Sequence, residues 1–163
     1  MESRKVKLNT AKEEFSSAIL KILDENIDVT ITVTGNSMFP LWKHKRDTVV
    51  LSKCAKTALQ KGDIPLYRRD TGQFVLHRII KVNNDSYNLC GDAQTQIEYN
   101  LKKDNILAVV KAFTRKGKEY SCNNPWYRLY TVLWLKLLPV RGVILKVCRI
   151  IQRIINVRSD KSS

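Results

Sequence analysis

The chain has 163 residues, of which 44% are apolar and 27% are charged, and this composition excludes a wholly disordered chain. The net charge of +14 first suggests nucleic-acid binding. The charge is uneven, however, because residues 111–163 hold 12 Lys and Arg against 2 acids, whereas residues 1–110 hold 17 against 13. The basic character therefore belongs to the last third of the chain, and no nucleic-acid partner is expected.

The opening residues are polar and lack an apolar core, so a secretory signal peptide is not expected. The longest charge-free run in the apolar tail covers residues 129–135, which is short of the roughly 20 apolar residues that a membrane span needs. The four cysteines are widely spaced and form no CxxC pair, so the sequence predicts neither a metal site nor a cofactor.

The first two-thirds of the chain predict a helix followed by short strands. Apolar residues recur at helical spacing over residues 9–25, which indicates an amphipathic helix within an N-terminal segment, 1–26. β-Branched and alternating patterns then predict strands at 28–34, 48–52, 64–69, 73–82, 86–90 and 106–114. The fold class is therefore expected to be mainly β, with a compact antiparallel domain at residues 27–115.

The remaining residues, 116–163, predict a helical tail. Residues 125–138 are aromatic and aliphatic, Pro139 should interrupt any helix, and residues 140–157 place apolar and basic residues on opposite sides of a second helix. Such a basic amphipathic tail is typical of binding to an anionic membrane surface, and packing on its own domain or on a partner subunit is the alternative. The residues expected to meet the membrane are Trp126, Trp134, Arg141, Lys146, Arg149 and Arg153.

Five short blocks follow one another in an informative order. Residues 34–40 read TGNSMFP after an expected strand, and RDTVV (46–50), KGDI (61–64), VLHRII (75–80) and GDA (91–93) come later. In these blocks the chain resembles the superfamily of serine peptidases that contains signal peptidases and self-cleaving repressors, over roughly residues 30–112. The resemblance implies the antiparallel β-fold of that superfamily. Arg46 and Gln94 depart from its usual Gly and Asn.

The resemblance implies a nucleophile at Ser37 and a general base at His77. A serine hydroxyl needs a neighbouring base to take its proton, and histidine titrates close to working pH. Histidine at this position resembles the endoplasmic-reticulum-like branch of the superfamily, whereas the common bacterial enzymes have lysine. His44 belongs to a basic surface run, and Arg78 is expected to form a local ion pair.

The residues around the serine are expected to bind substrate. The backbone N–H of Ser37 is the first candidate for stabilising the oxyanion, and Asn36 is a second. Gly35 would let a substrate strand approach closely. Met38 is expected to shape the substrate pocket, and Pro40 completes the motif.

The sequence does not decide which acid would orient His77. Asp92 belongs to the GDA block. Glu98 lies about where the histidine branch has an acidic pair, which reads Ile97-Glu98 in this chain. A Ser–His dyad without an acid is the third alternative.

The expected function is that of a serine endopeptidase that removes a leader or signal segment from a peptide or protein precursor bound in extended form. It would act as a peripheral protein on the cytoplasmic face of a membrane, or else residues 126–157 would insert as a hairpin. A self-cleaving repressor is one alternative, although the 36 residues before Ser37 are too few for a DNA-binding domain with a linker. A catalytically inactive, membrane-docked binding module is the other.

Overall fold

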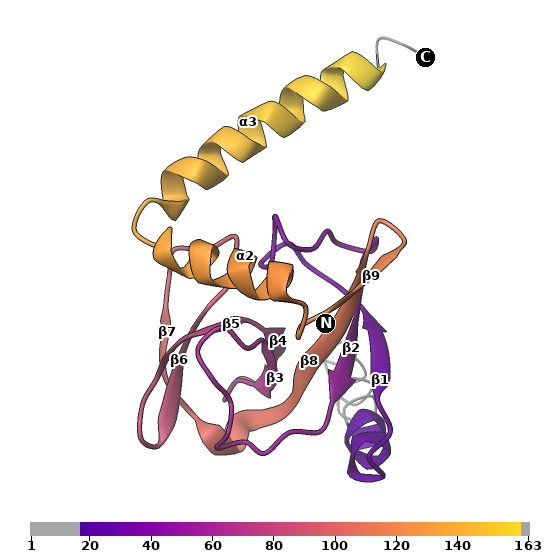
Figure 1. Cartoon of the computed structure of the whole chain (residues 1–163), viewed down its shortest axis with the longest axis vertical. Helices are drawn as coiled ribbons and strands as arrows, with labels where there is room; N and C mark the ends of the chain where they lie inside the picture. Colours follow the sequence, from indigo (N-terminus) through magenta and orange to yellow (C-terminus); the bar gives the residue numbers. More distant parts are fainter. Residues whose placement is uncertain (1–16, 161–163) are drawn as a thin grey trace, which may run out of the picture.

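The computed structural model of the protein describes residues 17–160, without the side chains of residue 149 and residues 152–160. In this range an antiparallel β-structure lies between a helix at residues 17–24 and two C-terminal helices (Figure 1). The expected mainly β fold class is confirmed. Residues 9–16 of the predicted first helix and the rest of segment 1–16 lie outside the described residues.

The strands form two sheets. The larger sheet has the order β1-β2-β8-β3-β4, and β9 pairs with β8; the smaller has the order β5-β6-β7. All the pairings are antiparallel. The strands are β1 (Val29–Thr32), β2 (Thr48–Ser52), β3 (Pro65–Arg68), β4 (Phe74–Leu76), β5 (Arg78–Val82), β6 (Ser86–Cys90), β7 (Glu98–Lys102), β8 (Ile106–Arg115) and β9 (Lys118–Ser121).

The single strand expected at residues 73–82 is divided in the structure. β4 pairs with β3 in the larger sheet, whereas β5 pairs with β6 in the smaller one. His77 lies between them and belongs to neither strand. The change of sheet therefore fixes His77 at the junction between the two layers.

Two apolar cores hold the sheets in place. The first contains Ile19 and Leu23 of the N-terminal helix together with Met38 and Trp42, and the second contains Tyr67 and Ile79 among others. Burial of such side chains contributes about 1.5–3 kcal/mol each relative to leaving them exposed. Met38 is thus anchored in the core directly after Ser37.

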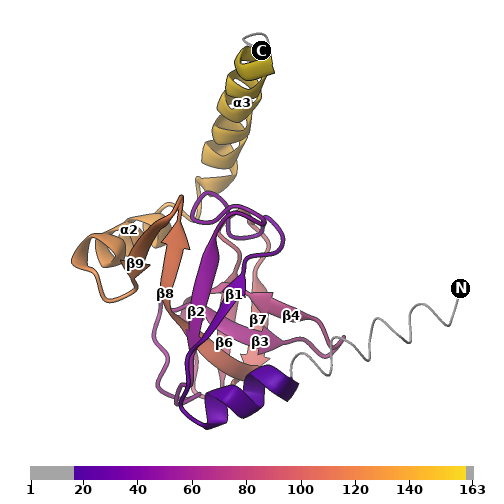
Figure 2. The ribbon, with the colours of Figure 1, turned by 90° about the vertical axis from the view of Figure 1, so that its right-hand side faces the viewer.

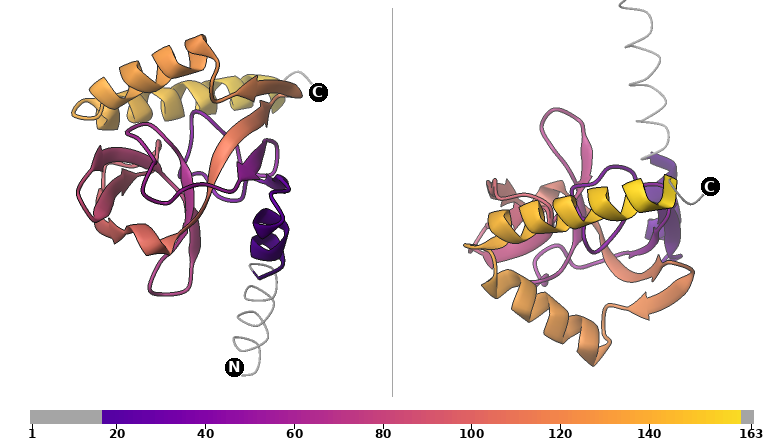
Figure 3. Two further views of the ribbon diagram at one scale, coloured as in Figure 1. Left: turned by 60° about the horizontal axis from the view of Figure 1, so that its bottom comes forward. Right: turned by 90° about the horizontal axis from the view of Figure 1, so that it is seen from above.

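The tail forms the two predicted helices. In α2 (Pro125–Lys136), the Asn124 side chain accepts a hydrogen bond from the Trp126 backbone N–H, which caps the helix. After a break at Pro139, α3 (Arg141–Asp160) begins. Both helices lie at the end of the β-structure opposite the N-terminal helix, and α3 projects away from it (Figures 2 and 3). No helix in the described part of the chain is long and apolar enough to cross a membrane.

Candidate functional site

Ser37 lies in the loop that follows β1. The backbone N–H of Gly35, a residue with φ of +93°, donates to Nδ1 of the exposed His44 side chain at 2.8 Å. The carbonyl oxygen of Ser37 accepts a 2.7 Å hydrogen bond from the backbone N–H of Ala93. Ser37 is partly exposed, whereas Met38 is buried. The loop therefore presents Ser37 at the surface of a firmly held segment.

His77 is buried, with only 1% of its surface exposed. Its Nδ1 lies 2.8 Å from Oε1 of Glu98 and 3.1 Å from the hydroxyl oxygen of Tyr67. Glu98 is the first residue of β7, and Tyr67 lies on β3. Two strands, β3 and β7, thus bring a phenol and an acid to the same nitrogen of the imidazole.

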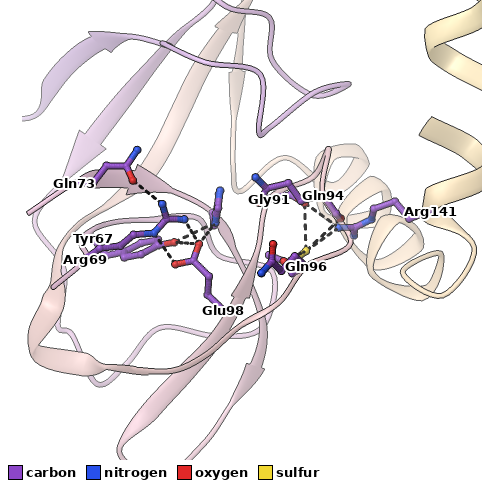
Figure 4. A network of polar contacts seen from close by, with 10 residues as sticks. Tyr67, Arg69, Gln73, Gly91, Gln94, Gln96, Glu98 and Arg141 are labelled. Carbon is purple, nitrogen blue, oxygen red and sulfur yellow. Dashed lines mark hydrogen bonds and ion pairs between the residues drawn. The ribbon is translucent and has the colours of Figure 1, made fainter. Parts of the chain in front are cut away.

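Glu98 is itself held by several donors (Figure 4). Tyr67 donates to Oε1 at 2.7 Å, Arg69 donates through Nε to Oε2 at 2.8 Å, and a second Arg69 nitrogen donates to Oε1. Arg69 also donates to Oε1 of Gln73 at 2.6 Å. Burial opposes ionisation of Glu98, but the hydrogen bonds from Arg69 and Tyr67 outweigh it and lower the pKa of this carboxyl below its usual value. Glu98 is therefore a carboxylate at neutral pH.

Asp92 has a different partner. Its two carboxylate oxygens accept hydrogen bonds of 2.9 and 2.7 Å from Nε and Nη2 of Arg78, and both side chains are completely buried. The remaining Arg78 nitrogen donates to the Gly62 carbonyl and to Thr131 Oγ1. Of the two acids that the sequence leaves open, Glu98 is therefore the one in contact with His77. Asp92 forms the local ion pair that was expected for Arg78.

Burial lowers the pKa of His77 below its ordinary value of 6.5, even though the charge of Glu98 acts to raise it. A neutral imidazole that donates Nδ1–H to Glu98 leaves Nε2 as a proton acceptor. A methyl group placed on Gly91 would lie 3.0 Å from this Nε2 and 2.7 Å from the Ser37 carbonyl oxygen. Nε2 therefore faces the small space that Gly91 leaves open beside the Ser37 backbone.

Ser37 and His77 line the same groove, which has a volume of about 790 Å³. The groove is bordered by β1 and β4, the two edge strands of the larger sheet. Its walls are mainly apolar and include Ile19, Ile22, Val33, Leu66, Phe74 and Leu76. An edge strand offers unpaired backbone groups to an extended peptide, so this groove can hold a polypeptide segment beside the serine.

The residues expected to bind substrate are mostly at this groove. Gly35, Asn36 and Met38 line it. Pro40 does not, and its carbonyl oxygen instead accepts a hydrogen bond from Arg115 at 3.3 Å. The serine, the histidine and most of the surrounding motif therefore meet in one place. Among the described residues, no group of three or more His, Cys, Asp or Glu side chains is placed to hold a metal ion.

The predicted membrane residues of the tail divide into three groups. Trp126 and Lys146 are exposed. Trp134 and Arg141 are buried against the β-structure, with 6% and 0% of their surface exposed, so these two predictions need correction. The side chains of Arg149 and Arg153 lie outside the described residues. The sequence pattern of the tail indicates which residues share a helix face. It does not reveal whether that face meets a membrane or is covered by the β-structure, and so it misplaced Trp134 and Arg141.

Tyr67 and Arg69 were not identified from the sequence, although a signal for them exists. The turn at residues 70–72 predicts a hairpin, and side chains two residues apart on a strand share a face. Tyr67 and Arg69 therefore share a face with His77, and in the structure Tyr67 is paired with Val75, two residues before His77.

No family model matches the chain, and no curated protein matches it at a significant level.

Proposed function

We propose that this protein is a serine endopeptidase of the signal-peptidase type, in which Ser37 is the nucleophile, His77 the general base and Glu98 the acid that orients the base. The observation that carries the proposal is that Ser37 and His77 line one groove, while Glu98 contacts the Nδ1 atom of His77. The resemblance of the TGNSMFP and VLHRII blocks to the peptidase superfamily supports the same roles.

In the proposed reaction, Nε2 of His77 takes the proton of the Ser37 hydroxyl as the serine oxygen attacks the carbonyl carbon of the scissile bond. The proton then passes from Nε2 to the leaving amine, which departs and leaves an acyl group on Ser37. His77 then takes a proton from a water molecule, whose oxygen attacks the acyl carbon. The bond between this carbon and the serine oxygen breaks, His77 returns the proton to Ser37, and the acyl group leaves as a carboxylic acid. Glu98 stays ionised throughout and stabilises the imidazolium that forms twice.

The negative charge that develops on the carbonyl oxygen requires hydrogen-bond donors that are already in position. The backbone N–H of Ser37 is the first candidate, and Asn36 is the second. Both residues line the groove in a loop that is tied to Ala93 and His44. A fixed loop supports this role because its donors need little reorganisation during the reaction.

The proposed substrate is a leader or signal segment of a peptide or protein precursor, bound as an extended strand. The two sheet edges along the groove support an extended peptide, and the apolar walls support a segment with apolar character. The superfamily resemblance adds a preference for small residues before the scissile bond.

We further propose that the tail docks peripherally on an anionic membrane, at the cytoplasmic face. α2 contains no acidic residue and α3 contains one, at its last position, so the tail is complementary to anionic lipids. Apolar side chains are exposed along both helices and include Trp126, Leu129, Leu133, Val143, Val147 and Ile150.

The test of the peptidase proposal is cleavage of a pool of synthetic peptides with varied sequences, read by mass spectrometry. The purified full-length chain is compared with Ser37→Ala, His77→Ala and the matched control Ser121→Ala, whose serine is exposed on β9. The proposal expects cleavage next to small residues by the wild type and the control, and none by the other two. Cleavage that persists in Ser37→Ala would overturn it, and a wild type that binds peptides without cleaving them would indicate a binding module.

A further inference from the structure

Arg141, the first residue of α3, is a buried cation. None of its surface is exposed. Its guanidinium donates to the Gly91 carbonyl oxygen at 3.3 Å and to the Trp134 carbonyl oxygen at 3.1 Å, and Nη1 lies 3.8 Å from Sγ of Cys90. The guanidinium carbon also lies 5.0 Å from the centre of the Trp134 ring. The charge is therefore held by backbone carbonyls and an aromatic face.

No carboxylate of the described residues forms an ion pair with Arg141. Burying a charge without such a partner is unfavourable, and burial lowers the pKa of Arg141 below its ordinary value. An apolar side chain would fill the position at a smaller cost. Compared with an apolar side chain, Arg141 supplies guanidinium N–H donors to Sγ of Cys90 and to the Gly91 carbonyl oxygen.

The 90–94 turn lies between the nucleophile and the base of the proposed site. A methyl group on Gly91 would collide with the Ser37 carbonyl oxygen, at 2.7 Å, and would crowd Nε2 of His77, at 3.0 Å. The Ala93 backbone N–H donates to the same Ser37 carbonyl oxygen at 2.7 Å. Asp92 is fixed by Arg78, the residue that follows His77. A displacement of this turn would therefore change how Ser37 and His77 face each other.

Figure 4 shows Arg141 reaching from the helical tail to Gly91, on the opposite side from Tyr67, Arg69 and Glu98. Glu98 and Tyr67 contact Nδ1 of His77. From this arrangement we infer that Arg141 is a positioning residue. It ties the start of α3 to the Gly91 turn, and this turn keeps Ser37 facing Nε2 of His77. This inference rests on the proposed peptidase function. It makes the tail a structural part of the active site as well as a docking device.

The test removes the hydrogen-bond donors of Arg141 but keeps most of the volume of its side chain. Arg141→Met is expected to fold with an unchanged or higher Tm, because an apolar isostere of a buried charge is often neutral or stabilising. Its kcat on the best peptide should fall about 10- to 100-fold with little change in KM, since small misplacements of reacting groups carry costs of this size. Arg141→Lys should recover part of kcat, and the control Lys118→Ala, an exposed cation on β9, should match the wild type.

A second readout does not depend on catalysis. The chain has two histidines, so the ring proton signals of His77 and His44 can be followed separately by NMR. Arg141→Met is expected to shift the His77 signals more than those of His44, and Lys118→Ala should shift neither. If the wild type cleaves no peptide, the peptidase proposal fails and these signals alone decide the positioning role. Unchanged His77 signals, or full kcat in a folded Arg141→Met protein, would overturn the inference.

Discussion

Glu98 carries an unusual share of the polar contacts around His77. Oε1 accepts hydrogen bonds from Tyr67 and Arg69 and lies 2.8 Å from Nδ1 of His77, while Oε2 accepts a hydrogen bond from Arg69. These donors keep the carboxyl ionised in a partly buried position. The proton on the imidazole is thereby held at Nδ1, and Nε2 stays available as a base.

The first prediction concerns this acid. Glu98→Gln keeps the size of the side chain but removes its charge, so kcat/KM on the best peptide should fall by about 100-fold or more, in the range of general acid–base contributions. Glu119→Gln on the exposed β9 strand is the matched control and should behave as the wild type. A Glu98→Gln protein with full activity would show that His77 needs no acid.

The second prediction is the pH dependence. The proposed mechanism requires the base form of His77, and burial lowers the pKa of His77, so the acid limb of kcat/KM should lie below pH 6.5. Peptide cleavage should then be retained at neutral pH and lost as the pH falls through the pKa that His77 has in the folded protein. Because the charge of Glu98 acts to raise the pKa of His77, residual activity of Glu98→Gln should fall off at a still lower pH. An acid limb above 6.5 would contradict the buried, neutral histidine.

At the scale of elements, α2 is locked onto the β-structure beside the site. Arg78 donates to Oγ1 of Thr131 on α2 and to the Gly62 carbonyl oxygen. Gly62 has φ of +105°, and a methyl group placed on it would lie 2.8 Å from Cγ2 of Thr131. The turn before β3 and the helix therefore approach each other as closely as a glycine allows.

The third prediction follows from this contact. Gly62→Ala should lower the free energy of unfolding for two reasons. The added methyl group strains the backbone at a positive φ, and it also overpacks against Thr131, which costs about 1–3 kcal/mol in addition. Gly117→Ala isolates that strain, because its φ is +77° and nothing lies within 4 Å of the added methyl group. In urea unfolding, Thr131→Ser should recover part of the loss caused by Gly62→Ala, since it removes Cγ2. If Gly62→Ala and Gly117→Ala lowered the free energy of unfolding equally, the close approach of Gly62 to Thr131 would be contradicted.

The elements differ in how far the sequence reveals them. β2 and β6 match the expected ranges, because β-branched residues or turn residues mark their bounds. β7 was missed since Asn100 has a φ of +55° and the pairing with β6 shifts register, and both interrupt the period of two. β9 was missed because all four of its residues are exposed, so it has no apolar face. The β-structure therefore extends past residue 115 to Ser121.

The site shows the same division. Short motifs predict the pairing of Ser37 with His77, and the structure places both residues along one groove. The motifs did not choose between Asp92 and Glu98, because the choice depends on which strands cross behind His77 and on the buried partner Arg78. The role of Arg141 depends equally on a contact far away in the sequence, its hydrogen bond to the Gly91 carbonyl oxygen.

At the scale of the whole molecule, charge and exposed apolar surface are concentrated at one end. α2 and α3 extend from the end of the β-structure opposite the N-terminal helix (Figure 1). The exposed cations Arg128, Lys136 and Lys146 therefore lie at this end together with the exposed apolar residues of α2 and α3. This arrangement supports docking that leaves the β-structure free to receive a substrate.

The fourth prediction is lipid-selective binding. The full chain should float with vesicles containing phosphatidylglycerol and much less with pure phosphatidylcholine, and added salt should weaken the binding. Val143→Asp on α3 should reduce flotation, whereas Val82→Asp at an exposed position on β5 should not. Equal binding to neutral vesicles, or self-association in light scattering that Val143→Asp abolishes, would assign the apolar face to another partner.

The central claim is that Ser37 is a nucleophile activated by His77. The most direct measurement is acylation by a p-nitrophenyl ester of an N-acetylated small amino acid, quenched in acid and mapped by peptide mass spectrometry. One acyl group is predicted on the peptide that contains Ser37, absent in Ser37→Ala and formed about 100-fold or more slowly in His77→Ala. An acyl group that forms at the wild-type rate in either variant would contradict the account.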